Sequence, residues 1–263
     1  MRKPHRTFGS FVRILVTNDD GILARGLRAL SGALLERGHD VVVVAPDREQ
    51  SASSHAITLD RPLRIREIEE KWFSVDGTPT DCVLVGCHGI LRAKPDLVIS
   101  GINHGPNMGE DVTYSGTVAA AFEAHILGVP SIAASMKDRE GGDFAGAAQL
   151  VARLAEALLE RHCTRPAILN VNFPPGEALG WLKPRLTRLG TRYYTDELIE
   201  KEDPRGRKYY WIGGAEAIWN GGEDTDFATV AQGSVSVTPL HLNLTDEEAR
   251  QELKDWDLAG CFS

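Results

Sequence analysis

The chain has 263 residues, of which 42% are hydrophobic and 25% are charged. This is the ordinary mixture of a globular protein and excludes a disordered chain, a collagen or a coiled coil as a description of the whole. The formal net charge is −8, so the totals show no basic footprint of the kind that a protein binding duplex nucleic acid usually carries.

The cysteine pattern and the lack of a long apolar segment point to a cytoplasmic protein. None of the four cysteines has a partner at C-x-x-C spacing, which argues against a zinc ribbon or a thioredoxin-type site. The aliphatic run 41–45 is far shorter than the roughly 20 residues of a membrane span. No apolar segment follows the basic N-terminus as it would in a signal peptide. Residues 1–12 are therefore expected to be a mobile extension.

The first part of the chain alternates short apolar runs with amphipathic stretches. Residues 13–18 and 40–45 are rich in β-branched side chains, and leucines recur at helical spacing over residues 26–36 between them. A strand, a helix and a strand so close together predict a βαβ unit with parallel strands. At roughly 100–200 residues per domain, the length allows one large domain or two small ones.

The same alternation continues to about residue 172. We expect strands over residues 57–68, 72–75, 96–100, 131–135 and 167–172, and helices beginning after the N-cap Thr78 and over residues 116–127 and 144–159. This order predicts an α/β fold, a Rossmann-like, doubly wound and mostly parallel sheet. Residues 13–180 would form its catalytic core.

The pattern changes after Pro174 and Pro175. Short strand-like runs at residues 209–212 and 234–238 are separated by glycine pairs, which predicts β-hairpins that project from the core. Residues 245–248 read as a capping box that opens a C-terminal helix. Residues 181–263 would thus form a hairpin and helix extension.

Two adjacent carboxylates, Asp19 and Asp20, follow the first predicted strand. Ligands of open α/β sheets bind outside the carboxyl ends of the strands, and a divalent cation there would remove the repulsion between the two charges. The alternative is structural: one aspartate caps the next helix and the other is solvated.

Two further polar segments leave the same edge of the predicted sheet. Residues 45–52 follow the second strand, and the spacing alone favours a plain surface loop. Ser51 would offer a hydroxyl oxygen, and Arg48 would either clamp a phosphate or be solvated. A glycine-rich loop over residues 100–109 contains Asn103 and His104, and Ser115 then opens a helix through Gly116 and Thr117. Free N–H groups at such a helix start bind anions.

Oxygen donors dominate this set. Asp19, Asp20, Ser51 and Asn103 suit Mg²⁺, Mn²⁺ or Ca²⁺ better than Zn²⁺, and a metal with water ligands beside an anion cradle suits phosphoester hydrolysis. The chain has no G-x-S-x-G, no P-loop, no G-x-G-x-x-G after the first strand and no H-E-x-x-H, which argues against several rival chemistries. His104 is either a proton-transfer group or a loop residue near the site.

Six ordered motifs resemble the SurE family of survival-protein nucleotidases. They are residues 14–22 (ILVTNDDGI), 44–48 (VAPDR) with Ser51 and Ala52, 77–82 (GTPTDC), 100–103 (SGIN), 105–109 (GPNMG) and 115–117 (SGT). Residues 235–239 (VSVTP) fit the C-terminal part of the family. The extension before Arg13 departs from the pattern but touches no motif.

The resemblance implies a 5′-nucleotidase, a metal-dependent phosphoric monoester hydrolase that acts on nucleoside 5′- and 3′-monophosphates. It implies one divalent ion per subunit, Mg²⁺ or Mn²⁺, held by Asp19, Asp20, Ser51 and Asn103, with phosphate at Ser115, Gly116 and Thr117. It also implies a homodimer or homotetramer in which the C-terminal hairpin and helix are exchanged between subunits.

The expected reaction is direct attack of a metal-activated water on the phosphomonoester, with Asp19, Asp20 and Asn103 as catalytic residues. Asn103 would also hold a phosphate oxygen. One alternative is an aspartyl-phosphate phosphatase with Asp19 as nucleophile, although the usual Asp-x-Asp spacing is missing. The other is a non-catalytic module that binds a nucleotide or a metal.

Overall fold

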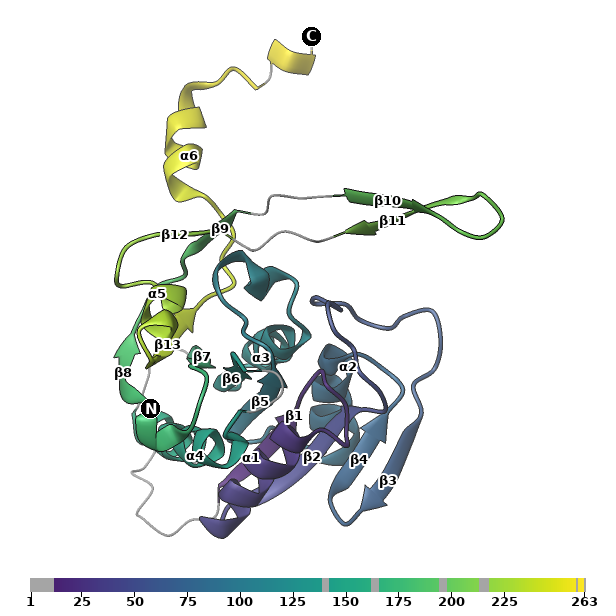
Figure 1. Ribbon diagram of the computed structural model, residues 1–263, viewed down its shortest axis with the longest axis vertical. Helices are drawn as coiled ribbons and strands as arrows, with labels where there is room; N and C mark the ends of the chain where they lie inside the picture. The colour runs from purple at the N-terminus through teal and green to yellow at the C-terminus, as the bar shows by residue number, and fades with distance from the viewer. Residues whose placement is uncertain are drawn as a thin grey trace.

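The computed structural model describes residues 12–138, 142–161, 166–193, 198–212, 218–258 and 260–262. Its centre is a nine-stranded sheet in the order β3-β4-β2-β1-β5-β6-β7-β13-β8 (Figure 1). These strands are β1 (Arg13–Thr17), β2 (Asp40–Pro46), β3 (Ile65–Glu69), β4 (Trp72–Val75), β5 (Leu97–His104), β6 (Ser131–Met136), β7 (Ile168–Phe173), β8 (Leu182–Leu186) and β13 (Ser234–Leu240).

The six inner strands from β4 to β7 run parallel to one another. The outer strands break this pattern, because β3 is antiparallel to β4 and β13 is antiparallel to β7. The chain builds outward from β1 to β2 and β4, and then from β5 to β6 and β7 on the other side. The junction of β1 and β5 is therefore the switch point of a doubly wound sheet, where a crevice forms. The predicted fold class is confirmed.

Helices cover both faces of the sheet, which explains why the inner strands are almost wholly apolar. On one face, α1 (Arg25–Glu36) and α4 (Phe144–Glu160) bury residues such as Leu30 and Val151 against the sheet. On the other face, α2 (Pro79–Leu84) and α3 (Gly116–Ile126) bury Val83 and Ala124. A π-helical turn, Val85–Ile90, extends α2.

Strand β5 is longer than the predicted strand 96–100, because its backbone continues through a register irregularity between Ser100 and Asn103. Gly101 makes this possible. It has φ 137°, and a Cβ there would lie 2.3 Å from the carbonyl oxygen of Ala134. Only glycine fits so close an approach. The irregularity brings Asn103 opposite Ser135 of β6, so Asn103 belongs to the strand and the predicted loop begins after His104.

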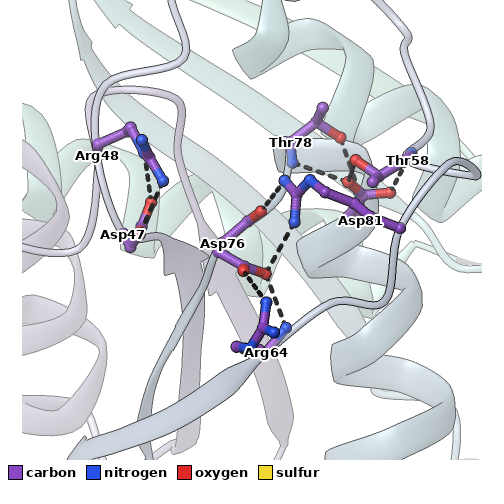
Figure 2. A network of polar contacts seen from close by, with 8 residues as sticks. Asp47, Arg48, Thr58, Arg64, Asp76, Thr78 and Asp81 are labelled. Carbon is purple, nitrogen blue, oxygen red and sulfur yellow. Dashed lines mark hydrogen bonds and ion pairs between the residues drawn. The ribbon is translucent and has the colours of Figure 1, made fainter.

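The predicted strand 57–68 was wrong over its first part, since only Ile65–Glu69 forms β3. The segment before it is held by side-chain hydrogen bonds instead of a sheet ladder (Figure 2). The Asp81 carboxylate accepts from the backbone N–H and the hydroxyl of Thr58, at 3.0 and 2.6 Å, and from the N–H of Thr78 at 2.9 Å. The Thr78 hydroxyl in turn accepts from the N–H of Asp81 and donates to the carbonyl of Ala56.

The predicted N-cap of α2 is thus confirmed as a capping box that also ties down the preceding loop. Figure 2 shows Asp76 beside Arg64. Both Arg61 and Arg64 form ion pairs with the Asp76 carboxylate. The two aspartates fasten the chain between β2 and β3 to the end of β4 and the start of α2.

After residue 180, part of the chain joins the central sheet and part projects away from it. The predicted hairpin exists: β10 (Leu198–Glu202) pairs with β11 (Lys208–Ile212) and projects away from the sheet (Figure 1). A second pair joins β9 (Thr191–Tyr193) to β12 (Ile218–Asn220), and α5 (Asp226–Ala231) follows. The prediction that residues 234–238 project was wrong. They form β13, because their buried side chains extend the main sheet beside β7.

At the C-terminal end, α6 (Glu247–Glu252) begins one residue later than the predicted capping box implies, with Asp246 as N-cap. The division of the chain at residue 180 stays a prediction, and residues 1–11 of the expected extension lie outside the described residues. Within the described part of the chain, no helix is both long and apolar enough to cross a membrane.

Replacing Asp81 with alanine should lower the free energy of unfolding by about 2–4 kcal/mol, because three hydrogen bonds to a buried carboxylate are lost. Chemical denaturation of the purified protein measures this. Asp47→Ala is the matched control: its partner Arg48 is 67% exposed, so the loss should stay below about 0.5 kcal/mol. Equal losses in the two variants would contradict the assigned role of Asp81.

Candidate active site

A cleft of about 810 Å³ opens at the switch point of the sheet. All four predicted metal ligands, Asp19, Asp20, Ser51 and Asn103, line it, and so does Ser115. The structure thus brings together residues that are up to 96 positions apart in the chain. The reason is topological, since the segments that follow β1 and β2 leave the same edge of the sheet at which Asn103 lies near the end of β5.

Asp19 is the most buried carboxylate of this cleft, with an exposed fraction of 5%. Its Oδ2 accepts the backbone N–H of Thr117 at 3.0 Å, and its Oδ1 accepts the Thr117 hydroxyl. Burial, reinforced by the adjacent charge of Asp20, raises the pKa of Asp19 to about 6, although the hydrogen bonds from Thr117 oppose the shift. Among the described residues, no Lys or Arg forms an ion pair with Asp19.

The structure rejects the reading of Asp19 as a cap of the helix that follows it. Helix α1 has Ala24 as its N-cap and no side-chain cap hydrogen bond. Asp19 instead reaches across the switch point to the first turn of α3. Its neighbour Asp20 accepts the backbone N–H of His104 at 3.0 Å. The two carboxylates therefore connect β1 to the start of α3 and to the end of β5.

Ser51 is brought to the cleft by a turn that is fastened at both ends. The N–H of Gln50 donates to the carbonyl of Asp19 at 2.7 Å. At the other end, the N–H of Ser54 donates to the carbonyl of Tyr114 and its hydroxyl to the carbonyl of Thr113. The Ser51 hydroxyl itself donates to the carboxylate of Glu49, a cleft residue that the sequence reasoning missed.

The start of α3 packs directly beneath the carboxylates. Ser115 caps the helix by accepting the N–H of Val118 at 3.1 Å, as predicted. A Cβ on Gly116 would lie 3.0 Å from the Cβ of Asp19, so glycine permits this close approach. Thr117 is fully buried and directs both of its donors to Asp19. Ser115 faces the cleft, whereas the side chain of Thr117 holds Asp19.

His104 lines the cleft with its ring centroid 4.7 Å from that of Phe144. Burial, followed by the nearby charge of Arg25, lowers the pKa of His104. Its Nε2 atom is buried and has no hydrogen-bond partner among the described residues. A neutral imidazole is therefore favoured, and a proton-transfer role stays a prediction.

A buried amide network anchors the glycine-rich loop after His104. The N–H of Asn107 donates to Asn172 Oδ1 at 2.8 Å, and its carbonyl accepts from the side chains of Asn170 and Asn172. Its own side-chain amide donates to the hydroxyl of Ser135 at 2.7 Å. The alternating Asn-x-Asn at the end of β7 was the available signal for this support, and the sequence reasoning did not use it.

Two other cleft residues were missed because their position depends on distant parts of the chain. Tyr114 lies in the turn before Ser115, and Arg192 comes from β9, beyond the predicted core boundary. No local motif marks either residue. The predicted phosphate clamp Arg48 is not among the residues that line the cleft, and its guanidinium pairs with Asp47.

The donor set fits a hard divalent cation. Asp19 and Asp20 are adjacent carboxylates, one of them buried, and Ser51 and Asn103 add neutral oxygen atoms at the same cleft. Within the described ranges, no three His, Cys, Asp or Glu side chains gather as a metal-binding group. A site with two carboxylates and neutral oxygens suits Mg²⁺ or Mn²⁺, which keep several water ligands.

The chain resembles known proteins over nearly its whole length. The family model of the survival protein SurE matches residues 14–196. The 5′-nucleotidase SurE of Anaeromyxobacter dehalogenans strain 2CP-C is 52% identical over 95% of this chain and 97% of its own. The 5′-nucleotidase SurE of Geobacter sulfurreducens is 51% identical over 95% of each chain.

A solved structure shares the same architecture. The crystal structure of the SurE protein from Aquifex aeolicus superposes with a TM-score of 0.83 at 43% sequence identity, covering 92% of this chain and 98% of that one. Sequence and fold thus agree over the strands and loops that build the cleft. The chain belongs to the SurE family.

Proposed function

We propose that this protein is a metal-dependent 5′-nucleotidase that hydrolyses nucleoside 5′-monophosphates, and also 3′-monophosphates, to nucleoside and phosphate. The observation that carries the proposal is the carboxylate pair Asp19 and Asp20 held against the N-terminus of α3 inside one cleft. Relatives with about half of their residues in common bear the name 5′-nucleotidase. The negatively charged walls and the helix N-terminus together suit a cation and a phosphate side by side.

Asp19 and Asp20 are the residues that would hold the divalent ion, with Ser51 and Asn103 as neutral ligands. When bound, such an ion neutralises phosphate charge and lowers the pKa of its water. The protein's part is positioning. Thr117 fixes the plane of the Asp19 carboxylate through two hydrogen bonds, and the N–H of His104 fixes Asp20.

The phosphate would lie at the first turn of α3, where Ser115 faces the cleft and Gly116 lets the helix pack closely against Asp19. Backbone N–H groups of Ser115 and Gly116 would stabilise the charge that develops on the phosphoryl oxygens. The N–H of Thr117 already donates to Asp19, so Thr117 serves this site by holding that carboxylate. The Asn103 amide donates to the carbonyl of Gly105, which leaves its oxygen as the ligand atom.

Two rivals make different predictions. An aspartyl-phosphate route would need Asp19 to attack phosphorus, yet both of its oxygens accept hydrogen bonds from Thr117 and the side chain is buried. A phosphoenzyme trapped by acid quench would favour that route over direct attack of water. A non-catalytic binding module would release no phosphate from any nucleotide, with or without metal.

We also infer a homo-oligomer joined through the projecting hairpin. Strands β10 and β11 are exposed along their whole length, and Trp211 and Ile212 are 62% and 87% exposed. A lone two-stranded hairpin is only marginally stable in water, and exchanging such an arm between subunits is a low-cost route to a dimer.

Asp19→Asn and Asp20→Asn should each remove most phosphate release from nucleoside monophosphates without unfolding the protein. In Asp19→Asn, the amide can still accept from the N–H of Thr117 and donate to its hydroxyl, so the metal-free melting temperature should hold or rise as charge repulsion falls. Phosphate release is measured with Mn²⁺, Mg²⁺ or EDTA.

Asp47→Asn, an exposed carboxylate that does not line the cleft, serves as control and should keep full activity. Turnover in either active-site variant that recovers only at millimolar metal supports the ligand role. Near-normal turnover at low-micromolar metal would overturn it, since a lost ligand must appear as lost metal affinity.

Replacing Trp211 and Ile212 together with serine should shift the protein to a smaller assembly in light scattering, because it removes the apolar surface of the hairpin. Leu59→Ser is the control, since Leu59 is also an exposed apolar side chain at 89% but lies outside the C-terminal extension. An unchanged mass for the double variant, with the fold intact by circular dichroism, would contradict an interface through the hairpin.

A further inference from the structure

The cleft contains a positively charged side chain that belongs neither to the proposed metal site nor to the proposed phosphate site. Four carboxylates line it, those of Asp19, Asp20, Glu49 and Asp111. Arg192 is the only lysine or arginine among the described residues of the lining. An arginine in so acidic a cleft is a candidate for ligand binding, because its planar fork of N–H donors favours defined hydrogen-bonded partners.

Arg192 is held in a fixed direction by three contacts. Its backbone N–H donates to the carboxylate of Glu110, and its guanidinium pairs with Asp111. The guanidinium also lies 5.2 Å from the ring centroid of Trp219, which stacks on Phe227. A guanidinium has five N–H donors, and Arg192 lines the cleft, so its guanidinium is suited to donate to a ligand there.

A buried aspartate locks the two backbone segments that meet at this arginine. Asp226 is fully buried and accepts the N–H groups of Gly109 at 2.8 Å and of Gly190 at 3.0 Å. Gly109 opens the 3₁₀ helix Gly109–Thr113, which carries the carboxylates that bind Arg192. Gly190 precedes the strand that carries Arg192 itself. Asp226 is thus a positioning residue for this side of the cleft.

The location of Arg192 separates it from the phosphate cradle. Its partner Asp111 lies on the 3₁₀ helix Gly109–Thr113, which ends two residues before Ser115. Tyr114, which is 60% exposed, lies between this helix and Ser115 and also lines the cleft. The wall of the cleft thus continues from Ser115 past Tyr114 to Asp111 and Arg192.

We propose that Arg192 and Tyr114 form the nucleoside-binding end of this cleft, an inference that rests on the proposed nucleotidase function. Arg192 donates hydrogen bonds to acceptor atoms of the sugar and base, and Tyr114 offers an aromatic face beside them. The pair makes the enzyme select nucleoside monophosphates over simple phosphomonoesters, while the chemistry at phosphorus stays with Asp19, Asp20 and the start of α3.

The test compares Arg192→Gln with Arg188→Gln on adenosine 5′-monophosphate and on 4-nitrophenyl phosphate, which has no sugar or base. Arg188 is a matched control, because it lies in the same segment but pairs with Asp224 and does not line the cleft. Losing hydrogen bonds from a charged donor should raise KM for the nucleotide in Arg192→Gln by about tenfold or more.

In Arg192→Gln, kcat should change less than about threefold, and the kinetics on 4-nitrophenyl phosphate should stay as in the wild type. Arg188→Gln should leave both substrates unaffected. A KM that rises equally for both substrates in Arg192→Gln would place this arginine at the phosphate and overturn the proposal. Unchanged kinetics on both substrates would do so too, because they would show that Arg192 only supports the fold.

A second measurement separates this inference from the proposed function. Calorimetry with adenosine alone on the metal-free proteins should show weaker binding for Arg192→Gln than for the wild type or Arg188→Gln. If the wild type releases phosphate from no substrate, the nucleotidase proposal fails and adenosine binding still decides the role of Arg192. Equal binding by all three proteins would refute it. If Arg192→Gln does not fold, the same comparison is made with Arg192→Lys, which keeps the positive charge but lacks the planar guanidinium.

Discussion

The hydrogen bonds between Asp19 and Thr117 are the constraint on which the site depends. They join the end of β1 to the first turn of α3 across the switch point of the sheet. A carboxylate that is buried there without an ion pair in the described structure is electrostatically expensive, as its raised pKa shows. The two hydrogen bonds from Thr117 oppose this cost and hold the carboxylate in one orientation. A charged group that is already oriented loses little entropy when it binds a cation.

Much of the site was predictable because it follows from strand order. Asp19, Asp20, Ser51 and Asn103 stand close in sequence to the carboxyl ends of β1, β2 and β5, and parallel strands deliver such residues to one edge. The resemblance of the six motifs to the SurE family is confirmed by the family match. The length of β5 was not predictable, since its irregularity depends on the close approach of Gly101 to β6.

The remaining features depend on contacts between distant segments. Residues 57–64 look like a strand but have hydrogen-bond partners outside the sheet, on Asp81 of α2 and on Asp76 after β4. Ser234–Leu240 resembles a hairpin strand, yet it is buried because an edge of the sheet lies open beside β7. Arg192 and Asp226 follow no local motif. Arg192 reaches the cleft because the carboxylate of Asp226 joins Gly109 to Gly190, which lies two residues before it.

The contacts of Asp226 with Gly109 and Gly190 bear on which part of the chain is needed to build the cleft. The matched region ends at residue 196, four positions after Arg192, whereas Trp219, Asp226 and β13 all lie beyond it. A fragment cut at that boundary would keep the metal ligands and the start of α3. It would lose the stacking partner of Arg192, the anchor of Gly109 and the strand that covers β7. The region that the family model matches is therefore smaller than the unit of structure that builds the cleft.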